Sequence, residues 1–233
     1  MASPPSFATV AEAFQYAREL DAPINDRLQL VADAMRQHYV PYTASVEAMI
    51  ARLNRTDAGA SAPWVGEPMP PFMLPDEAGR LTTLEELIAA GPVALSFHRG
   101  QWCPFCRLNT IALAALQDSL PRGRIVAITP DRRRYAALLK TKAGASFPVL
   151  TDMDNAYALS LNLAVWLDEQ VRAEMLALDT DIAESQGNDR WILPIPATFV
   201  VGSDGVIAAR QIDPDFRHRM DVETLRQALI AAP

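Results

Sequence analysis

The cysteine pair at the start of a predicted helix constrains this chain more than any other feature of its sequence. An uninterrupted apolar segment, Val93 to Phe97, predicts a buried strand, and Cys103-Pro104-Phe105-Cys106 follows it after a short loop. A helix is predicted from Cys103 to Leu120, because apolar residues recur there at helical spacing: Leu108, Ile111, Ala112, Ala115 and Leu116. The two sulfur atoms therefore meet at a junction between a strand and a helix.

This placement favours thiol chemistry. Two intervening residues put the sulfur atoms of Cys103 and Cys106 about one helical turn apart, close enough to bridge. Unpaired N–H groups and a partial positive charge at a helix start favour the reactive thiolate. Arg99 and Arg107 flank the pair and act in the same direction, and Pro104 suits the first helical turn. We expect a redox-active dithiol that solvent can reach.

Other uses of the cysteines fit less well. A structural disulfide here would close a very short loop, for which the expected stabilisation is small. A structural zinc site needs four ligands, and the histidines, His38, His98 and His218, are scattered. Redox chemistry is therefore favoured over a metal site, which we do not expect, and over inert packing. The sequence has no nucleotide, flavin or nicotinamide fingerprint, so no cofactor is expected, and a reducing protein or a small thiol would supply electrons.

Composition excludes several classes of protein. The 233 residues are 50% hydrophobic and 21% charged, which is ordinary for a globular chain. A net charge of −7 disfavours nucleic acid and anionic membranes as partners. The only two cysteines are near neighbours, which excludes a disulfide-framed secreted scaffold. No apolar run is long enough to span a bilayer, and the first residues, MASPPSFATVAEAF, lack a secretory signal, so a cytoplasmic location is expected.

The first 60 residues read as a helical extension. Helices are predicted over Phe7–Leu20 and around Leu28, Val31 and Met35, with Asp26 as a candidate cap. A further apolar stripe must be buried, either within the chain or in a homodimer formed through these helices: Val46, Met49, Ile50 and Leu53. A proline-rich segment, residues 54–71, then separates an extension, residues 1–60, from a domain, residues 61–233.

From residue 72 onward strands and helices alternate. Strands are predicted at Phe72–Leu74, Val93–Phe97, Arg124–Thr129, Phe147–Leu150, Thr198–Gly202 and Val206–Ile212. Residues 165–190 read as a helical, acidic insertion, and a last helix runs from a capping Asp221 to Ala231. This order predicts an α/β fold with a mixed central sheet covered by helices.

One proline precedes a predicted buried strand. Pro196 stands in Leu193-Pro194-Ile195-Pro196-Ala197, immediately before that strand. A cis Ile195–Pro196 bond would place a strained turn beside a neighbouring loop, and a plain trans turn is the alternative.

Together these residues resemble a known family. Trp102-Cys103-Pro104-Phe105-Cys106 after an apolar strand, with Pro196-Ala197-Thr198-Phe199 downstream, resembles the thioredoxin fold. The wider frame over about residues 62–233 resembles the peroxiredoxins of the alkyl hydroperoxide reductase and thiol-specific antioxidant (AhpC/TSA) group, in a subgroup with Trp-Cys-Pro-x-Cys. The resemblance implies a thioredoxin-like fold, a central mixed β-sheet flanked by helices, and an antioxidant role.

The chain also departs from the family pattern. Peroxiredoxins carry Pro-x-x-x-Thr-x-x-Cys, and alignment of the helix start places Cys106 at the peroxidatic cysteine and Cys103 at the threonine. Their activating arginine comes from the strand region where this chain has Pro196, as thioredoxins do. Arg99 is a candidate substitute for that arginine.

Three functions are compatible with these features. The first is a thiol–disulfide oxidoreductase in which Cys103, the more exposed thiol, attacks and Cys106 resolves, with Trp102, Pro196 and Arg99 at the substrate. The second is a thiol peroxidase in which a peroxide oxidises Cys106 and Cys103 resolves. The third is a redox-sensing interaction module whose partner surface is the N-terminal helices.

Several residues near the cysteines have more than one interpretation. His98, which ends the strand before them, is either a proton acceptor or a side chain that fills the loop. Arg217-His218-Arg219 is either a solvated basic run or, since its loop precedes the last helix, a segment near the active face. Residues 165–190 are a candidate lid.

Overall fold

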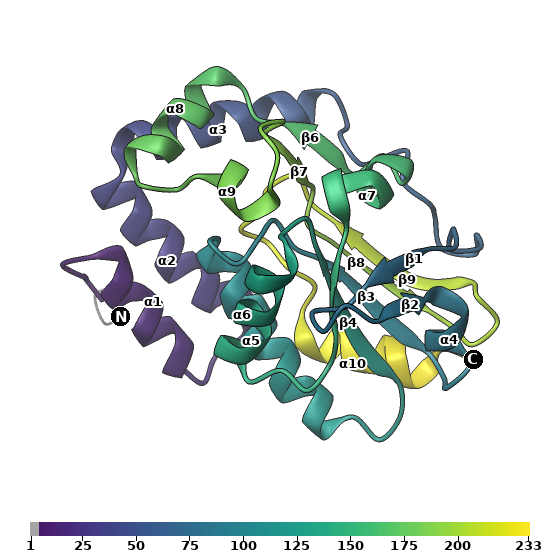
Figure 1. Cartoon of the computed structure of the whole chain (residues 1–233). Helices are drawn as coiled ribbons and strands as arrows, with labels where there is room; N and C mark the ends of the chain where they lie inside the picture. Colours follow the sequence, from purple (N-terminus) through teal and green to yellow (C-terminus); the bar gives the residue numbers. More distant parts are fainter. Residues whose placement is uncertain (1–4) are drawn as a thin grey trace.

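The computed structural model describes residues 5–233 (Figure 1). Residues 1–4, part of the segment in which no secretory signal is predicted, lie outside the described residues. Within residues 5–233, no helix is long and apolar enough to cross a bilayer.

A five-stranded mixed sheet forms the centre of the fold, with strand order β5-β4-β3-β8-β9. Its strands are β3 (Val93–Phe97), β4 (Arg124–Thr129), β5 (Val149–Thr151), β8 (Ala197–Val201) and β9 (Ile207–Ile212). β3 and β5 pair in parallel with β4, whereas β8 pairs antiparallel with both β3 and β9. The predicted mixed sheet is confirmed, and two of the predicted strands, β3 and β4, have the predicted bounds.

The alternation of side chains along the strands explains why both faces of the sheet are covered. Ala94 of β3 packs with α5 (Pro104–Ser119), α6 (Arg133–Ala143) and α10 (Val222–Ala231) in one buried cluster. Asp221 caps α10 as predicted, since its carboxylate accepts from the N–H groups of the first turn. Helix α5 thus lies on the sheet with its N-terminus at the carboxyl end of β3.

The opposite face of the sheet buries Leu95, Phe97 and Phe199. It is covered by a hairpin of β1 (Met73–Pro75) and β2 (Leu81–Thr83), by α4 (Leu84–Ile88), and by α7 (Ala156–Ser160) after a short 3-10 turn η1 (Met153–Asn155). The ring of Phe97 lies 6.0 Å from that of Tyr157 and 6.1 Å from that of Phe199. These contacts hold the end of β3 that leads into the cysteine loop.

The N-terminal helices α1 (Val10–Glu19), α2 (Ile24–His38) and α3 (Val40–Arg55) pack on the same chain, with α1 and α2 against α5 (Figure 1). The predicted stripe is covered there: Val46, Met49 and Ile50 are buried and Leu53 is partly buried. The alternative of burial within one chain therefore holds for this stripe, and the homodimer and the division at residue 60 stay predictions. Asp26 is not the cap of α2, because the helix begins earlier, after Pro23.

The predicted insertion is helical, and its two ends pair with each other. It contains α8 (Glu169–Ala177) and α9 (Ile182–Gln186), and an antiparallel pair, β6 (Ala164–Trp166) with β7 (Ile192–Pro194), joins its two ends. Helix α8 packs against α3, and Arg52 of α3 binds the carboxylate of Asp168 at 2.7 Å. The insertion and the N-terminal helices thus form one cover beside α5.

A substitution at Leu28 measures how much the packing of this cover on α5 stabilises the fold. The side chain of Leu28 is 0% exposed and lies in the cluster that contains both cysteines. We expect Leu28→Ala to lower the free energy of unfolding by about 2–5 kcal/mol, through lost apolar burial and a residual cavity. Leu176→Ala on α8 is the matched control, because Leu176 is 43% exposed, and it should cost about 0.5 kcal/mol or less. Equal effects of the two substitutions in urea unfolding would contradict the packing of α2 on α5.

Candidate active site

Both cysteines lie at the start of α5, where the loop after β3 ends. Cys103 is the N-cap residue, and Cys106 lies in the first turn, with Pro104 at the first helical position. The predicted junction between strand and helix is confirmed. Both thiols are free.

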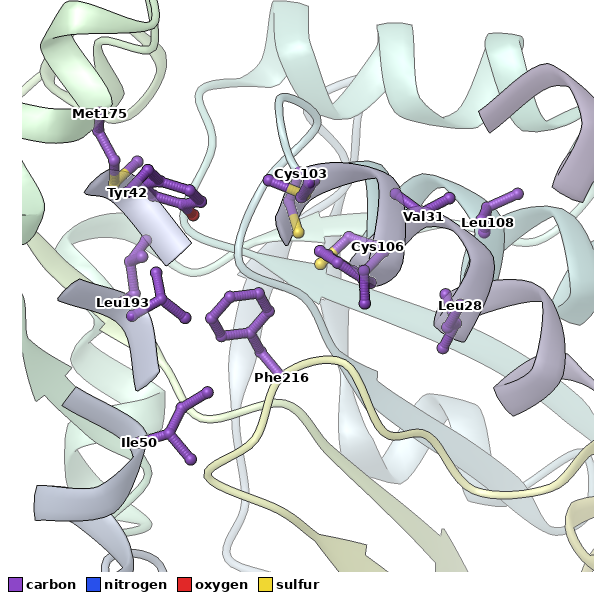
Figure 2. Close-up of a cluster of buried hydrophobic side chains, with 14 of the residues drawn as sticks. Leu28, Val31, Tyr42, Ile50, Cys103, Cys106, Leu108, Met175, Leu193 and Phe216 are labelled. Atoms are coloured by element: carbon purple, nitrogen blue, oxygen red, sulfur yellow. The ribbon is translucent and has the colours of Figure 1, made fainter. Parts of the chain in front are cut away.

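The prediction that solvent reaches the sulfur atoms is wrong. Cys103 is 1% exposed and Cys106 is 0% exposed, so Cys103 is not the accessible member of the pair. Side chains of α1, α2, α3 and α8 pack in the buried cluster that contains both cysteines. Figure 2 shows some of the cluster's side chains, which also come from β7 and the loop before α10: Leu28, Val31, Tyr42, Met175, Leu193 and Phe216. The sequence did not reveal this because the covering residues are distant along the chain.

Hydrogen-bond donors converge on the sulfur atom of Cys106. The backbone N–H of Arg99 donates to this sulfur at 3.3 Å, and Nη2 of Arg219 donates at 3.6 Å. Burial alone would raise the pKa of Cys106, but the neighbouring Cys103 and His98 and the charge of Arg219 outweigh it and hold this pKa well below its usual value. Cys106 is thus the member of the pair that is stabilised as a thiolate.

Cys103 has the opposite tendency. Burial raises the pKa of the Cys103 thiol well above its usual value, and its hydrogen bond to Cys106 and the negative charge there add to the effect, against Arg99 and Arg219. These opposite directions favour the thiolate at Cys106 and the protonated thiol at Cys103. This distribution is the reverse of the one expected if Cys103 is the attacking thiolate.

Arg99 is at the site, and its role as a substitute for the activating arginine stays a prediction. Its guanidinium carbon lies 3.7 Å from the ring centre of Phe216 and 5.0 Å from that of Trp102. The residue is 2% exposed, and within residues 5–233 its Nη1 and Nη2 have no hydrogen-bond partner. It is the backbone of Arg99 that contacts Cys106, while its side chain offers buried, unused donors next to the pair.

Arg219 is the functional candidate that no motif indicated. It lies before α10, and it is 5% exposed, so the interpretation of this loop as a solvated basic run does not hold for Arg219. Its guanidinium donates to the carbonyl oxygens of Phe216 and His218. The side chain of Asn25 on α2 makes two hydrogen bonds with the backbone of Arg219: it accepts from the N–H at 2.9 Å and donates to the carbonyl oxygen at 3.0 Å. The only signal in the sequence is the position of this residue before the last helix.

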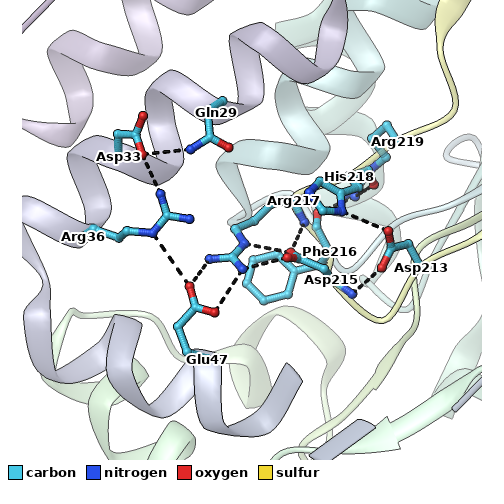
Figure 3. A network of polar contacts seen from close by, with 10 residues as sticks. All are labelled: Gln29, Asp33, Arg36, Glu47, Asp213, Asp215, Phe216, Arg217, His218 and Arg219. Atoms are coloured by element: carbon cyan, nitrogen blue, oxygen red, sulfur yellow. Dashed lines mark hydrogen bonds and ion pairs between the residues drawn. The ribbon is translucent and has the colours of Figure 1, made fainter. Parts of the chain in front are cut away.

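The loop of Arg219 is tied to the N-terminal helices by charged groups (Figure 3). Arg217 binds Asp215 of its own loop and Glu47 of α3, and Arg36 of α2 lies 3.7 Å from the same Glu47 carboxylate. These hydrogen bonds raise the pKa of Arg217 and, against a smaller effect of burial, lower that of Glu47. The network thus positions the loop that carries Phe216 and Arg219.

His98 is fully buried beside α5. Its Nε2 lies 3.0 Å from Oγ of Ser96, and its Nδ1 lies 3.4 Å from Oγ1 of Thr110. The imidazole fills the space after β3, as one interpretation predicted, and it also contributes to the lowered pKa of Cys106.

A buried carboxyl group that the sequence did not single out lies just after β4 and binds the loop between β3 and α5. Asp131 accepts the backbone N–H of Gln101 at 2.6 Å. Burial raises its pKa from 3.8 to about 7. Gly100 has φ +151°, and a Cβ there would lie 2.3 Å from Nε1 of Trp102 and 3.0 Å from Oδ1 of Asp131, so this position requires glycine.

Trp102 and Pro196 are both near the pair. Trp102 is half-buried and packs against the cluster that contains the cysteines. The Ile195–Pro196 bond is trans, so the cis alternative is wrong. Pro196 is buried where β8 meets the end of β3, and it lines a narrow cleft with Arg99 and Phe216. Pro196 therefore lies next to the Arg99 side chain.

Metal ligands are not gathered anywhere in the described chain. Within residues 5–233, no group of three or more His, Cys, Asp and Glu side chains is arranged to hold a metal ion.

Arg219 gives a test of the electrostatics. We expect Arg219→Gln to raise the pKa of Cys106, because it removes the nearest positive charge from the thiolate. Arg219→Lys should restore part of the shift, and Arg226→Gln on α10 should leave the pKa unchanged. Ultraviolet absorbance of the thiolate against pH measures this, and an unshifted titration in Arg219→Gln would reject the role of this cation.

Asp131 gives a pH dependence of stability. Its carboxyl group is harder to ionise in the folded than in the unfolded chain, so the folded state binds more protons between about pH 4 and 7 and stability falls as the pH rises through that window. We expect Asp131→Asn to remove this fall, which amounts to roughly 4 kcal/mol at most from about 1.4 kcal/mol per pKa unit. Parallel pH profiles of unfolding for the two proteins would contradict the raised pKa.

Comparison with known proteins agrees with the fold. Peroxidoxin BcpB from Mycobacterium tuberculosis is similar, with 20% identity, a TM-score of 0.56, and coverage of 72% of this chain and 96% of that chain. A peroxiredoxin-like protein from Aquifex aeolicus has 10% identity and a TM-score of 0.58, over 72% of this chain and 87% of its own. Thiol peroxidase from Chromobacterium violaceum has 15% identity and a TM-score of 0.54, with the same coverage of 72% and 87%. Among curated proteins, none matches the sequence significantly.

These likenesses establish the thioredoxin-like fold, with α1–α3 as an addition at its N-terminus. A family model described as the AhpC/TSA family matches residues 65–210, which is more than half of the chain and includes both cysteines. This protein therefore belongs to the AhpC/TSA family.

Proposed function

We propose that this protein is a thiol peroxidase in which Cys106 is the peroxidatic cysteine and Cys103 the resolving one. The observation that carries the proposal is the set of donors around the Cys106 sulfur atom: the N–H of Arg99 at 3.3 Å and the guanidinium of Arg219 at 3.6 Å. Such donors stabilise the thiolate, which is the nucleophile toward a peroxide.

Burial favours a small substrate. Cys103 and Cys106 are at most 1% exposed, so a folded protein cannot bring a disulfide to them unless the covering helices move. A hydroperoxide needs only a narrow path. The unpartnered Nη1 and Nη2 of Arg99 are placed beside the pair, where they can stabilise the oxygen that leaves the peroxide.

The reaction balances with the two thiols alone. The Cys106 thiolate attacks the distal oxygen of ROOH, the O–O bond breaks, and RO⁻ takes a proton to leave as ROH. The resulting Cys106 sulfenic acid condenses with the Cys103 thiol, which forms the disulfide and releases water. A reducing protein or a small thiol then returns two electrons and two protons to the pair.

Thiol–disulfide exchange is the second candidate, because the Cys-x-x-Cys spacing in one helical turn is suited to reversible closure of a disulfide. In this candidate Cys106 attacks, in place of Cys103, because the donors of Arg99 and Arg219 lie at the Cys106 sulfur atom. Trp102 and Pro196 would border such a substrate. The cytoplasmic location, the homodimer and the redox-sensing role are further predictions from the sequence.

Two cysteine variants test the roles of the thiols, and the rate of oxidation by peroxide separates the two functions. Cys106→Ser should abolish reduction of hydrogen peroxide, because it removes the stabilised thiolate. Cys103→Ser should still be oxidised once per chain, with a sulfenic acid at Cys106 that dimedone traps, and should form no intramolecular disulfide. Stopped-flow oxidation measures the rates in the native protein. Oxidation of Cys106 no faster than that of a free thiol at matched pH would eliminate the peroxidase and leave disulfide exchange.

A further inference from the structure

A cavity of about 320 Å³ lies between the N-terminal helices and the start of α5. Trp102 and Pro104, the neighbours of Cys103 in the chain, form part of its wall, and Tyr42 stands on the same side. Tyr42 also belongs to the buried cluster that contains Cys103 (Figure 2). The cavity therefore approaches the pair from the Cys103 side, and its size is that of a small-molecule site.

A second cavity, of about 350 Å³, adjoins the first. Phe14 and Arg107 line both cavities, and the guanidinium of Arg107 lies 4.3 Å from the ring centre of Phe14. The second cavity adds Arg18 of α1 and Lys142 of α6 to its wall. One end of this combined space is thus apolar and aromatic, and the other carries three positive charges.

These three cations have no acidic counterpart. Within residues 5–233, no carboxylate lies within 4 Å of the charged groups of Arg18, Arg107 or Lys142. Burial lowers the pKa of Arg107, and Arg18 lowers it further, against an opposite effect of Cys103. The chain carries a net charge of −7, so an unpaired group of cations beside a cavity is a local feature that a bound anion would neutralise.

We propose that this pair of cavities binds an anionic, low-molecular-weight thiol, which reduces the Cys103–Cys106 disulfide with its thiol end toward Cys103 and its carboxylate among Arg18, Arg107 and Lys142. The inference rests on the proposed function, since it supplies the reductant for the same dithiol. It selects a small thiol over a reducing protein, because both sulfur atoms lie under the helical cover.

The direction of attack agrees with the chemistry of the pair. The incoming thiolate RS⁻ attacks the Cys103 sulfur, the Cys103–Cys106 bond breaks, and Cys106 leaves as the thiolate that its donors stabilise. A second molecule of the thiol attacks the mixed disulfide Cys103–S–S–R and releases RSSR and the Cys103 thiolate, which takes a proton. Two thiols are oxidised to one disulfide, and the enzyme gains two electrons.

The test compares 3-mercaptopropionate with neutral 2-mercaptoethanol as reductants of the full-length, peroxide-oxidised protein. Recovery of the free Cys103–Cys106 dithiol is followed by labelling of free thiols, with each rate divided by the thiolate concentration. We expect the anionic thiol to be faster by about fivefold or more at low salt. This preference should decline as salt is added, because screening weakens the attraction of the cations. Equal normalised rates would overturn the proposal.

Removal of two of the positive charges tests whether these cations cause the preference for the anionic thiol. Arg18 and Lys142 are exposed, so the double variant Arg18→Gln/Lys142→Gln should fold, and it should lose most of the preference for 3-mercaptopropionate. Arg55→Gln, at the end of α3 and away from both cavities, is the matched control and should keep the preference. A double variant that keeps the preference of the native protein would reject this site as its cause.

The outcome is separable from that of the proposed function. Oxidation of the native protein by hydrogen peroxide needs no reductant and is measured first. If Cys106 is not oxidised faster than a free thiol, the peroxidase fails, and the disulfide is then formed with a chemical oxidant for the same comparison of thiols. If oxidation is fast but neither thiol is preferred, the reductant site alone fails.

Discussion

The arrangement of this protein depends on one constraint: the sulfur atom of Cys106 is removed from water, so its negative charge must be stabilised by groups of the protein. Burial alone disfavours a thiolate. The backbone of Arg99, the guanidinium of Arg219 and the Cys103 thiol offset this cost. They come from the loop after β3, the loop before α10 and the start of α5, so the site exists only when these three parts of the fold are assembled.

The N-terminal helices belong to the site as well as to its cover. Asn25 of α2 holds the backbone of Arg219, and Glu47 of α3 binds Arg217 in the same loop. Tyr42 and Phe14 come from these helices and line the cavity beside Cys103. An extension outside the minimal thioredoxin-like fold thus excludes water, supports the cation at Cys106 and shapes the approach to Cys103. The same cover is the reason why we propose small partners for the pair.

Much of the fold was predictable because its signals are local. The apolar runs of β3 and β4, the helical spacing after Cys103 and the capping carboxylate of Asp221 each depend on neighbours along the chain. Two predictions were wrong, the exposure of the thiols and the cap at Asp26, and of the two alternatives for the bond before Pro196 the trans one holds. The first failed because the exposure of a side chain depends on which distant segments pack over it.

The sequence by itself determined the dithiol, its place at a strand–helix junction and the mixed α/β sheet, since spacing and periodicity are properties of neighbouring residues. The tertiary structure alone decided which sulfur atom the donors surround and which arginine side chain is among them. Arg219 lies 113 residues after Cys106, and only the folding of the last loop against α2 brings it there. A pKa depends on burial and on charges in space, and neither can be read from positions along a chain.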